Sequence, residues 1–314
     1  MNDIPRESIR NISIIGDHGD GKTSLIEGML FIGGSTDKLG NVDDGSSNLD
    51  YESEEKNRKM SINSHIAYYE WNNHLINIVD TPGFTNFLFE AESSIKVVDS
   101  VVVVISAVSG LRTQLRRFWQ MATDSGLPRV LFMNKLDKER ANFVSTITDI
   151  EKDLQIRTTP LTIPIGKEQD LKGVVDLIEM KAYIYEGDGK YSTEDVPNDS
   201  QEQANSIREK IIESIAETDD ELLEKYLDGE TFDNETIYTK MREGIISQKI
   251  IPLYAGSAIK LIGLNLIMDG INRYLPSPVE ISPLNITDSE GKSGELHPKL
   301  EETTSAYIFK TISD

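Results

Sequence analysis

The sequence predicts an α/β fold: a mostly parallel sheet with helices on both faces, plus an inserted α+β subdomain. Apolar runs of strand length alternate with segments of helical spacing, a pattern typical of a parallel sheet covered on both faces. Polar motifs follow several of these runs, where ligand sites of such sheets lie. The alternation is interrupted between about residues 155 and 252, which indicates the insert.

The first element is an apolar strand at residues 9–15, followed by a glycine-rich turn and a helix. The turn has the pattern G-x-x-x-x-G-K-T, in which backbone N–H groups and the helix N-terminus favour phosphate. An ordinary glycine-rich turn is the alternative. We expect Lys22 to reach the β- and γ-phosphates and the Thr23 hydroxyl to hold Mg²⁺. The predicted phosphate loop comprises Gly16, Asp17, His18, Gly19, Asp20, Gly21, Lys22, Thr23 and Ser24.

The elements that follow are assigned by periodicity. Residues 33–59 are polar and aperiodic, which is typical of a functional, mobile segment. Alternating residues at 61–71 and 75–79 flank Asn72-Asn73 and predict a hairpin. Further along, we expect helices at 84–98 and 113–123, and strands at 101–105 and 129–133.

Polar motifs stand at the ends of three predicted strands. Asp80 is placed to hold Mg²⁺ mostly through water, and the Gly83 N–H to sense the γ-phosphate. After the strand at 129–133, a carboxylate at Asp137 would accept two hydrogen bonds from guanine, which adenine cannot donate. Asn134 and Lys135 would support that loop and the ribose, and Ser257 and Ala258 would offer backbone N–H groups to guanine O6.

The second half of the chain predicts the insert and its exit. We expect β structure at 160–165, 173–178 and 181–185, followed by helices at 200–227 and 234–247. The main fold resumes with a strand at 250–255 and a helix at 263–275. Residues 279–301 read as a linker, and 302–314 as the first strand of a truncated β-barrel domain, because a lone terminal strand needs partners.

Composition narrows the function classes. The chain has 314 residues, a net charge of −21 and no cysteine, which excludes disulfides and thiolate metal sites. The four scattered histidines suggest no zinc cluster. The acidic balance argues against DNA binding, and the absence of long apolar stretches or a leader favours a cytoplasmic protein without membrane contact.

These motifs together resemble the GTP-binding domain (G domain) of the bacterial elongation factor G family, from about residue 10 to 278. The resemblance implies a P-loop NTPase fold over residues 1–278, GTP or GDP and Mg²⁺ as ligands, and GTPase activity linked to the ribosome, as a monomer. It also implies that the acidic helices around 213–226 touch the ribosomal stalk protein; a solvated face is the alternative. The matching residues are Asp44-Gly45, Asp50, Asp80-Thr81-Pro82-Gly83, Asn134-Lys135-Leu136-Asp137, 172–180, 221–227, Gly256-Ser257-Ala258 and 274–278.

The sequence departs from the family pattern near the phosphates. Phe84 stands where the family has the histidine that orients the attacking water, so we expect weak intrinsic hydrolysis. Ser61 replaces a threonine but keeps the hydroxyl that can bind Mg²⁺. His18 stands where the family has an apolar residue and is a candidate substitute for the lost histidine, with a solvent-facing side chain as the alternative. We expect Asp17 and Asp20 to point to solvent.

These departures resemble the divergent elongation-factor-G-like paralogues. The predicted function is a translational GTPase with Lys22, Gly83, Phe84 and His18 at the catalytic centre. One alternative is a GTP-gated switch that binds ribosomes and hydrolyses little. Another is a ribosomal-protection or release-factor-type GTPase, which Phe84 disfavours.

Overall fold

The computed structural model describes residues 4–287, 291–299 and 304–311. Its centre is a seven-stranded sheet in the order β2-β3-β1-β4-β5-β11-β6. Neighbouring strands are parallel except β2 and β3, which form the predicted hairpin. The strands are β1 (Ile9–Ile15), β2 (His65–Trp71), β3 (His74–Asp80), β4 (Ser100–Ser106), β5 (Arg129–Asn134), β6 (Thr158–Pro160) and β11 (Ile251–Ala255).

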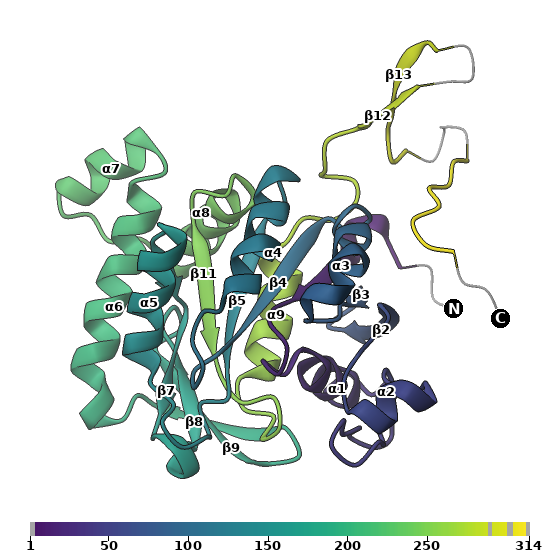
Figure 1. Ribbon diagram of the computed structural model, residues 1–314. Helices are drawn as coiled ribbons and strands as arrows, with labels where there is room; N and C mark the ends of the chain where they lie inside the picture. The colour runs from purple at the N-terminus through teal and green to yellow at the C-terminus, as the bar shows by residue number, and fades with distance from the viewer. Residues whose placement is uncertain (1–3, 288–290, 300–303, 312–314) are drawn as a thin grey trace.

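Helices flank this sheet, as predicted for an α/β fold (Figure 1). Helix α1 packs against α9, and α3 packs against α4; right-handed crossovers place these two pairs on opposite faces. All seven residues of β4 are buried at the middle of the sheet. The helices are α1 (Lys22–Ile32), α2 (Ser53–Arg58), α3 (Leu88–Ile95), α4 (Thr113–Asp124), α5 (Phe143–Leu154) and α9 (Leu264–Tyr274), with 3₁₀ turns at Arg6–Ser8, Thr85–Phe87 and Glu168–Asp170.

The insert has its own antiparallel sheet, in the order β10-β9-β8-β7. The predicted strand at 160–165 was wrong as a single element. Its start belongs to β6, which pairs with β11 of the main sheet, and its end forms β7, which pairs with β8. The insert comprises β7 (Thr162–Ile165), β8 (Gly173–Asp176), β9 (Lys181–Gly187), β10 (Lys190–Asp195), α6 (Asn198–Ala216), α7 (Asp220–Leu227) and α8 (Asn234–Ile246).

The segment after α9 differs from the predicted linker. It contains an antiparallel hairpin of β12 (Leu284–Thr287) and β13 (Ser293–Leu296), which extends away from the body (Figure 1). The strand expected within 302–314 is not formed by its described part, residues 304–311, because a strand requires a partner ladder and none lies beside it there. Its other residues lie outside the described ranges. Within those ranges, no helix is long and apolar enough to cross a membrane.

Candidate nucleotide site

The phosphate loop lies between β1 and α1 and has room only for glycine at two of its turns. A Cβ on Gly16 would lie 2.5 Å from the carbonyl oxygen of Val104, and one on Gly21 would lie 2.5 Å from Nδ2 of Asn134. Gly21 has φ +88°, which side chains rarely adopt. The loop is therefore closely wrapped, with its backbone available to a phosphate group.

Lys22 begins helix α1 and crosses the inside of this loop. Its Nζ donates to the carbonyl oxygens of Gly16 and Asp17 at 3.0 Å each, and the residue is 6% exposed. Burial lowers the pKa of Lys22, while Asp80 and Asp20 oppose that shift. This places a buried cation where polyphosphate charge would gather.

Three oxygen-bearing side chains converge beside Lys22. The Thr23 hydroxyl donates to Oδ2 of Asp80 at 2.8 Å and lies 3.0 Å from the hydroxyl of Ser61. Burial raises the pKa of Asp80 to about 7, and its Oδ1 has no hydrogen-bond partner. Hydroxyl and carboxylate oxygens with an unsatisfied buried carboxylate fit Mg²⁺, which binds through a few protein oxygens and phosphates. The predicted set of Thr23, Ser61 and Asp80 is thus brought together.

Asp17 and Asp20 do not point to solvent, contrary to expectation. They are 3% and 0% exposed, because Asp17 turns toward the start of α4 and Asp20 turns back onto the backbone of the loop. Oδ2 of Asp20 accepts from the Asp17 N–H at 3.2 Å, and burial raises the pKa of Asp20 to about 7. Burial also raises the pKa of Asp17, against backbone hydrogen bonds from Leu115 and Arg112.

His18 and Phe84 face one another where the phosphate loop meets the segment after β3. Their ring centroids are 3.8 Å apart with 31° between the planes. The backbone N–H of His18 donates to the backbone carbonyl of Gly83 at 3.1 Å. A Cβ on Gly83 would lie 2.4 Å from Lys22 Nζ. Burial, Lys22 and Arg112 lower the pKa of His18, which favours the neutral imidazole. The phosphate loop and the segment after β3 thus meet through the backbone of His18 and Gly83 and through the rings of His18 and Phe84.

Arg112, which the sequence reasoning did not include, also reaches this point. Its guanidinium donates to the His18 carbonyl oxygen at 3.3 Å. No periodicity marked it, because it precedes α4 in the sequence and meets the loop only in the fold.

The predicted base-reading residues form one network at the ends of β5 and β11. Asn134 donates to the Asp20 carbonyl at 2.8 Å and accepts from the Ala258 N–H at 2.9 Å. The Ser257 hydroxyl donates to Asp137 at 2.7 Å, and Lys135 reaches the Gly19 carbonyl.

The Ser257 N–H also has a protein partner, the Ile262 carbonyl. The N–H groups of Ser257 and Ala258, expected to contact guanine O6, are therefore engaged within the protein. In this structure the two residues support Asn134 and Asp137.

A cavity of about 200 Å³ joins these parts. Besides Ser24 and other loop residues, it is lined by the long polar segment 33–59, which folds back over the site. The family resemblance included Asp44-Gly45 and Asp50 of that segment, but these residues were not among the predicted site residues, since their positions depend on contacts with α1. The additional lining residues are Val42, Asp43, Asp50, Lys59, Met60 and Ile259.

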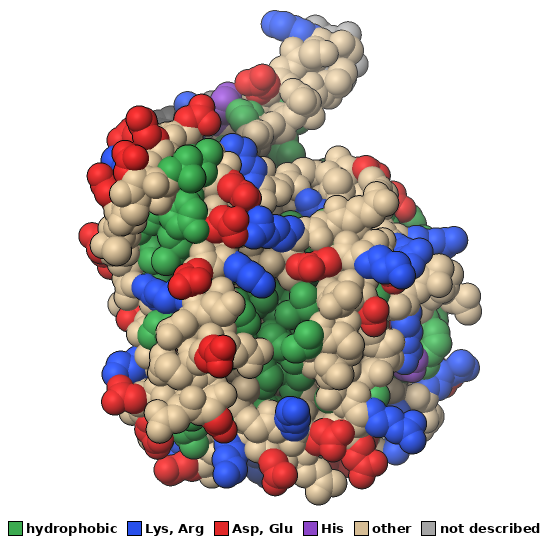
Figure 2. Space-filling model, turned by 90° about the vertical axis from the view of Figure 1, so that its left-hand side faces the viewer, with side chains coloured by type: hydrophobic (Ala, Val, Ile, Leu, Met, Phe, Trp, Pro, Cys, Tyr) green, Lys and Arg blue, Asp and Glu red, His purple; other side chains and the backbone are tan. Residues whose placement is uncertain are grey.

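A larger cavity, about 460 Å³, lies elsewhere, between α5 and α6. Figure 2 shows apolar side chains in a hollow on that side of the molecule, ringed by charged ones. Its apolar lining includes Phe143, Val144, Ile147, Ile207 and Ile211. None of the strand-end motifs contributes to it, so cavity size alone does not identify the nucleotide site.

Comparisons with known proteins agree with this geometry. A family model described as "Elongation factor Tu GTP binding domain" matches residues 7–277. Elongation factor G of Ureaplasma parvum serovar 3 and that of Ureaplasma urealyticum serovar 10 are each 38% identical over 307 residues, covering 97% of this chain and 45% of the relative. A solved structure from Thermus thermophilus is 29% identical, with a TM-score of 0.82 over 88% of this chain and 42% of the other. The chain spans less than half the length of these relatives.

Proposed function

Because the chain belongs to the family of the elongation factor Tu GTP-binding domain, we propose that it binds GTP with Mg²⁺ and hydrolyses GTP to GDP and phosphate on the ribosome, in the manner of an elongation-factor-G-like paralogue. The observation that carries the proposal is the meeting of four motifs at the carboxyl ends of β1, β3, β5 and β11; residues of the first three, and Ile259 next to the fourth, line one cavity. Ligands of parallel sheets bind at this edge.

In the proposed reaction, water forms a bond to the γ-phosphorus while the bond to the bridging oxygen of the β-phosphate breaks. Lys22 and the backbone N–H groups of the loop stabilise the negative charge on the phosphate oxygens. Thr23, Ser61 and Asp80 would hold Mg²⁺, which supplies further neutralisation of that charge when bound. Gly83 allows its segment to approach Lys22 and the loop closely.

His18 is the residue we propose for positioning the attacking water. The family pattern has an apolar residue at position 18 and a histidine at position 84, and this chain has the two types exchanged. The exchanged rings are in contact, at 3.8 Å, so an imidazole is still present at the meeting point of the loop and the segment after β3. A neutral imidazole can accept a hydrogen bond from water, and the lowered pKa of His18 favours that form.

The test is GTP turnover with and without ribosomes. His18→Ala should leave GTP affinity unchanged and reduce turnover by about 10²-fold or more, the usual contribution of a positioned acid–base group. The paired change His18→Val with Phe84→His restores the family arrangement and should recover turnover. His74→Ala, at the start of β3 and bonded to the Asn72 carbonyl, is the matched control. Unchanged turnover in His18→Ala would exclude this role.

A second candidate is a GTP-gated switch that occupies the ribosome and hydrolyses little. Phe84 favours it, since the side chain has no donor or acceptor and is stacked on His18. Strong ribosome stimulation of the natural protein would support the enzyme. A response confined to the Phe84→His variant would support the switch.

The ribosomal stalk protein is a further proposed partner, through α6 and α7. Both helices lie at the surface on the side shown in Figure 2, next to the apolar hollow beside α5. Leu227, at the end of α7, is 75% exposed and would supply an apolar side chain to this contact. Leu227→Asp should weaken binding to purified stalk protein without changing GTP affinity.

A further inference from the structure

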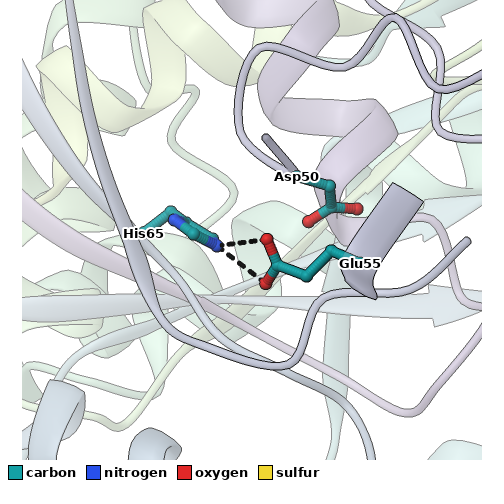
Figure 3. A group of neighbouring side chains, drawn as sticks. All are labelled: Asp50, Glu55 and His65. Atoms are coloured by element: carbon teal, nitrogen blue, oxygen red, sulfur yellow. Dashed lines mark hydrogen bonds and ion pairs between the residues drawn. The ribbon is translucent and has the colours of Figure 1, made fainter. Parts of the chain in front are cut away.

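Three buried side chains with metal-binding chemistry lie together beside the nucleotide site (Figure 3). Asp50 comes from the loop before α2, Glu55 from α2 and His65 from the first position of β2. Their exposed fractions are 2%, 0% and 6%. Among the residues that the structure describes, this is the one group of three His, Asp or Glu side chains close enough to share an ion. The expectation that the scattered histidines form no zinc cluster did not consider this grouping, because it depends on the fold.

The spacing suits a small divalent ion. Nε2 of His65 lies 2.9 and 3.0 Å from the two carboxylate oxygens of Glu55, and one ligand atom from each residue lies within 4.8 Å of the others. Ligands bonded at about 2.0–2.2 Å in a tetrahedral site are roughly 3.3 Å apart. His65 and Glu55 are hydrogen-bonded at slightly less than this spacing, so a bound ion would replace the proton between them, and the Asp50 carboxylate would move toward them.

The unpaired carboxylate of Asp50 is an independent observation that points to a bound cation. Neither of its carboxylate oxygens has a hydrogen bond of ordinary geometry, and burial raises the pKa of Asp50 although the nearby Ser61 hydroxyl opposes that shift. Figure 3 shows the carboxylate turned toward Glu55. A buried, unpaired carboxylate is costly, and a cation between Asp50, Glu55 and His65 would remove that cost.

The surroundings are also acidic. Glu27 and Glu55 act on Asp50 with the same sign of charge, and Asp80 lies close enough to His65 to act on it. Lys22 is the permanent cation that the described residues place near this group, and His65 carries a positive charge only in the protonated form, whose proton a bound ion would replace. The local balance therefore favours binding of a further positive charge.

We propose that Asp50, Glu55 and His65 bind a divalent transition-metal ion of the Zn²⁺ class, separate from the Mg²⁺ held by Thr23, Ser61 and Asp80. Imidazole nitrogen is a preferred ligand of Zn²⁺ and its neighbours, whereas Mg²⁺ prefers oxygen alone. Two of the ligands belong to the segment that covers the nucleotide cavity, and the third to the central sheet. The bound ion links that segment to β2.

The test uses Co²⁺ as a spectroscopic probe for Zn²⁺, with the nucleotide-free 314-residue protein in millimolar Mg²⁺. One equivalent of Co²⁺ should produce visible d–d bands of a low-coordinate nitrogen and oxygen site, and Zn²⁺ should displace it. His65→Ala should weaken Co²⁺ binding more than about 100-fold, since loss of even an outer partner typically costs 10–100-fold. Asp50→Asn, which keeps the His65–Glu55 contact, should weaken binding at least about 10-fold.

The controls are the two histidines that lie outside both proposed sites. His74→Ala and His297→Ala should leave Co²⁺ affinity unchanged; His297 is a necessary control because it lies 3.6 Å from Glu295. Thermal unfolding of each metal-free variant shows whether that variant is folded. If His65→Ala does not fold, the Co²⁺ affinity of Asp50→Asn decides the outcome of the test. Unchanged Co²⁺ affinity in the folded variants, or equal competition by Mg²⁺, would overturn the proposal and assign Asp50 to the Mg²⁺ site.

Discussion

Asp99 shows how a buried carboxylate can limit the stability of this fold. It is 6% exposed just before β4, where the Asn11 amide donates to it at 2.9 Å. Burial raises the pKa of Asp99 to about 6, with Asn11 and Arg10 opposing the shift. The Asp99 carboxyl group therefore binds a proton more tightly in the folded protein than in the unfolded chain. This residue's contribution to stability decreases as the pH rises from about 4 to about 6, and stays low above that.

Asp99→Asn should consequently stabilise the protein at neutral pH. The shift of about two pKa units sets an upper limit of about 3 kcal/mol at about pH 7.5. At about pH 3.5 the natural carboxyl is largely protonated in both states, so the gain should disappear. Urea unfolding at the two pH values measures this difference, with Asp149→Asn on the exposed side of α5 as the control. An equal effect at both pH values would show that charge burial is not the cause.

The residue scale also shows why side-chain directions were harder to predict than motifs. The phosphate loop was recognisable from its spacing, but the inward direction of Asp17 and Asp20 depends on α4, which is distant in the sequence. His65 and Glu55 meet because α2 folds back on β2. No local pattern contains such contacts.

At the scale of elements, the segment covering the nucleotide cavity is held to α1 by one carboxylate. Glu27 is fully buried and accepts from the Ser47 hydroxyl at 2.7 Å, the Asn48 N–H at 2.6 Å and the Leu49 N–H at 3.1 Å. The Asn48 side chain also donates to it, at 2.7 Å. All of these donors belong to residues 47–49, so the carboxylate acts as a single anchor for the loop before α2.

Glu27→Gln should release this segment without changing side-chain size. The glutamine amide replaces one accepting oxygen with an NH₂ group, which faces other donors, and it removes the negative charge of Glu27. A hydrogen bond to a charged group contributes about 1.5–3 kcal/mol to stability. Local opening should therefore become about 10–100-fold more frequent, seen as faster hydrogen exchange of the Asn48 and Leu49 amides. Glu54→Gln, an exposed partner of Arg58 in α2, is the matched control. Exchange rates equal to those of the natural protein would refute the anchor.

Helices and strands were predicted correctly where one apolar pattern ran without interruption, as in β1 and β4. Prediction failed where one apolar run contributes strands to two sheets, as at β6 and β7. The pairing of β6 with β11 is a tertiary contact that the local sequence does not specify. Helix α5 was not predicted at all, although its buried positions, Phe143, Thr146 and Ile150, have helical spacing. The hairpin of β12 and β13 was hidden in a stretch whose residues are largely exposed.

At the scale of the whole molecule, the nucleotide site was the most predictable part. Its residues lie far apart in sequence, from 16 to 258, but each group follows a strand of one parallel sheet, so topology alone brings them to one edge. What topology does not define is how the C-terminal segment contacts this body. Among the described residues, Arg6 donates to the Pro298 carbonyl, and Lys310 makes a further contact near the end of the segment.

Lys310 joins the C-terminal segment to residues next to the nucleotide site. Its Nζ lies 2.7 Å from Oε2 of Glu90 on α3 and donates to the carbonyl oxygen of Ser64 at 3.3 Å. The same Glu90 oxygen accepts from the N–H and hydroxyl of Ser64. Burial raises the pKa of Glu90, but hydrogen bonds from Lys310 and Ser64 outweigh it, and the net shift is downward. A depressed carboxyl pKa means that this contact stabilises the fold above the unfolded pKa and is lost as the pH falls through the folded one.

Lys310→Met keeps the length of the side chain and removes its charge, so it should weaken the contact between the segment and α3 at neutral pH. Both partners are about one-fifth exposed, which limits the expected loss to about 1 kcal/mol, or several-fold faster hydrogen exchange in residues 304–311. The natural protein should reach the same fast exchange, after correction for intrinsic rates, only when Glu90 is protonated at low pH. Lys152→Met on α5 is the control for a lost surface charge. If protection of residues 304–311 is the same in Lys310→Met and persists at low pH, apolar contacts rather than this ion pair hold the segment against α3.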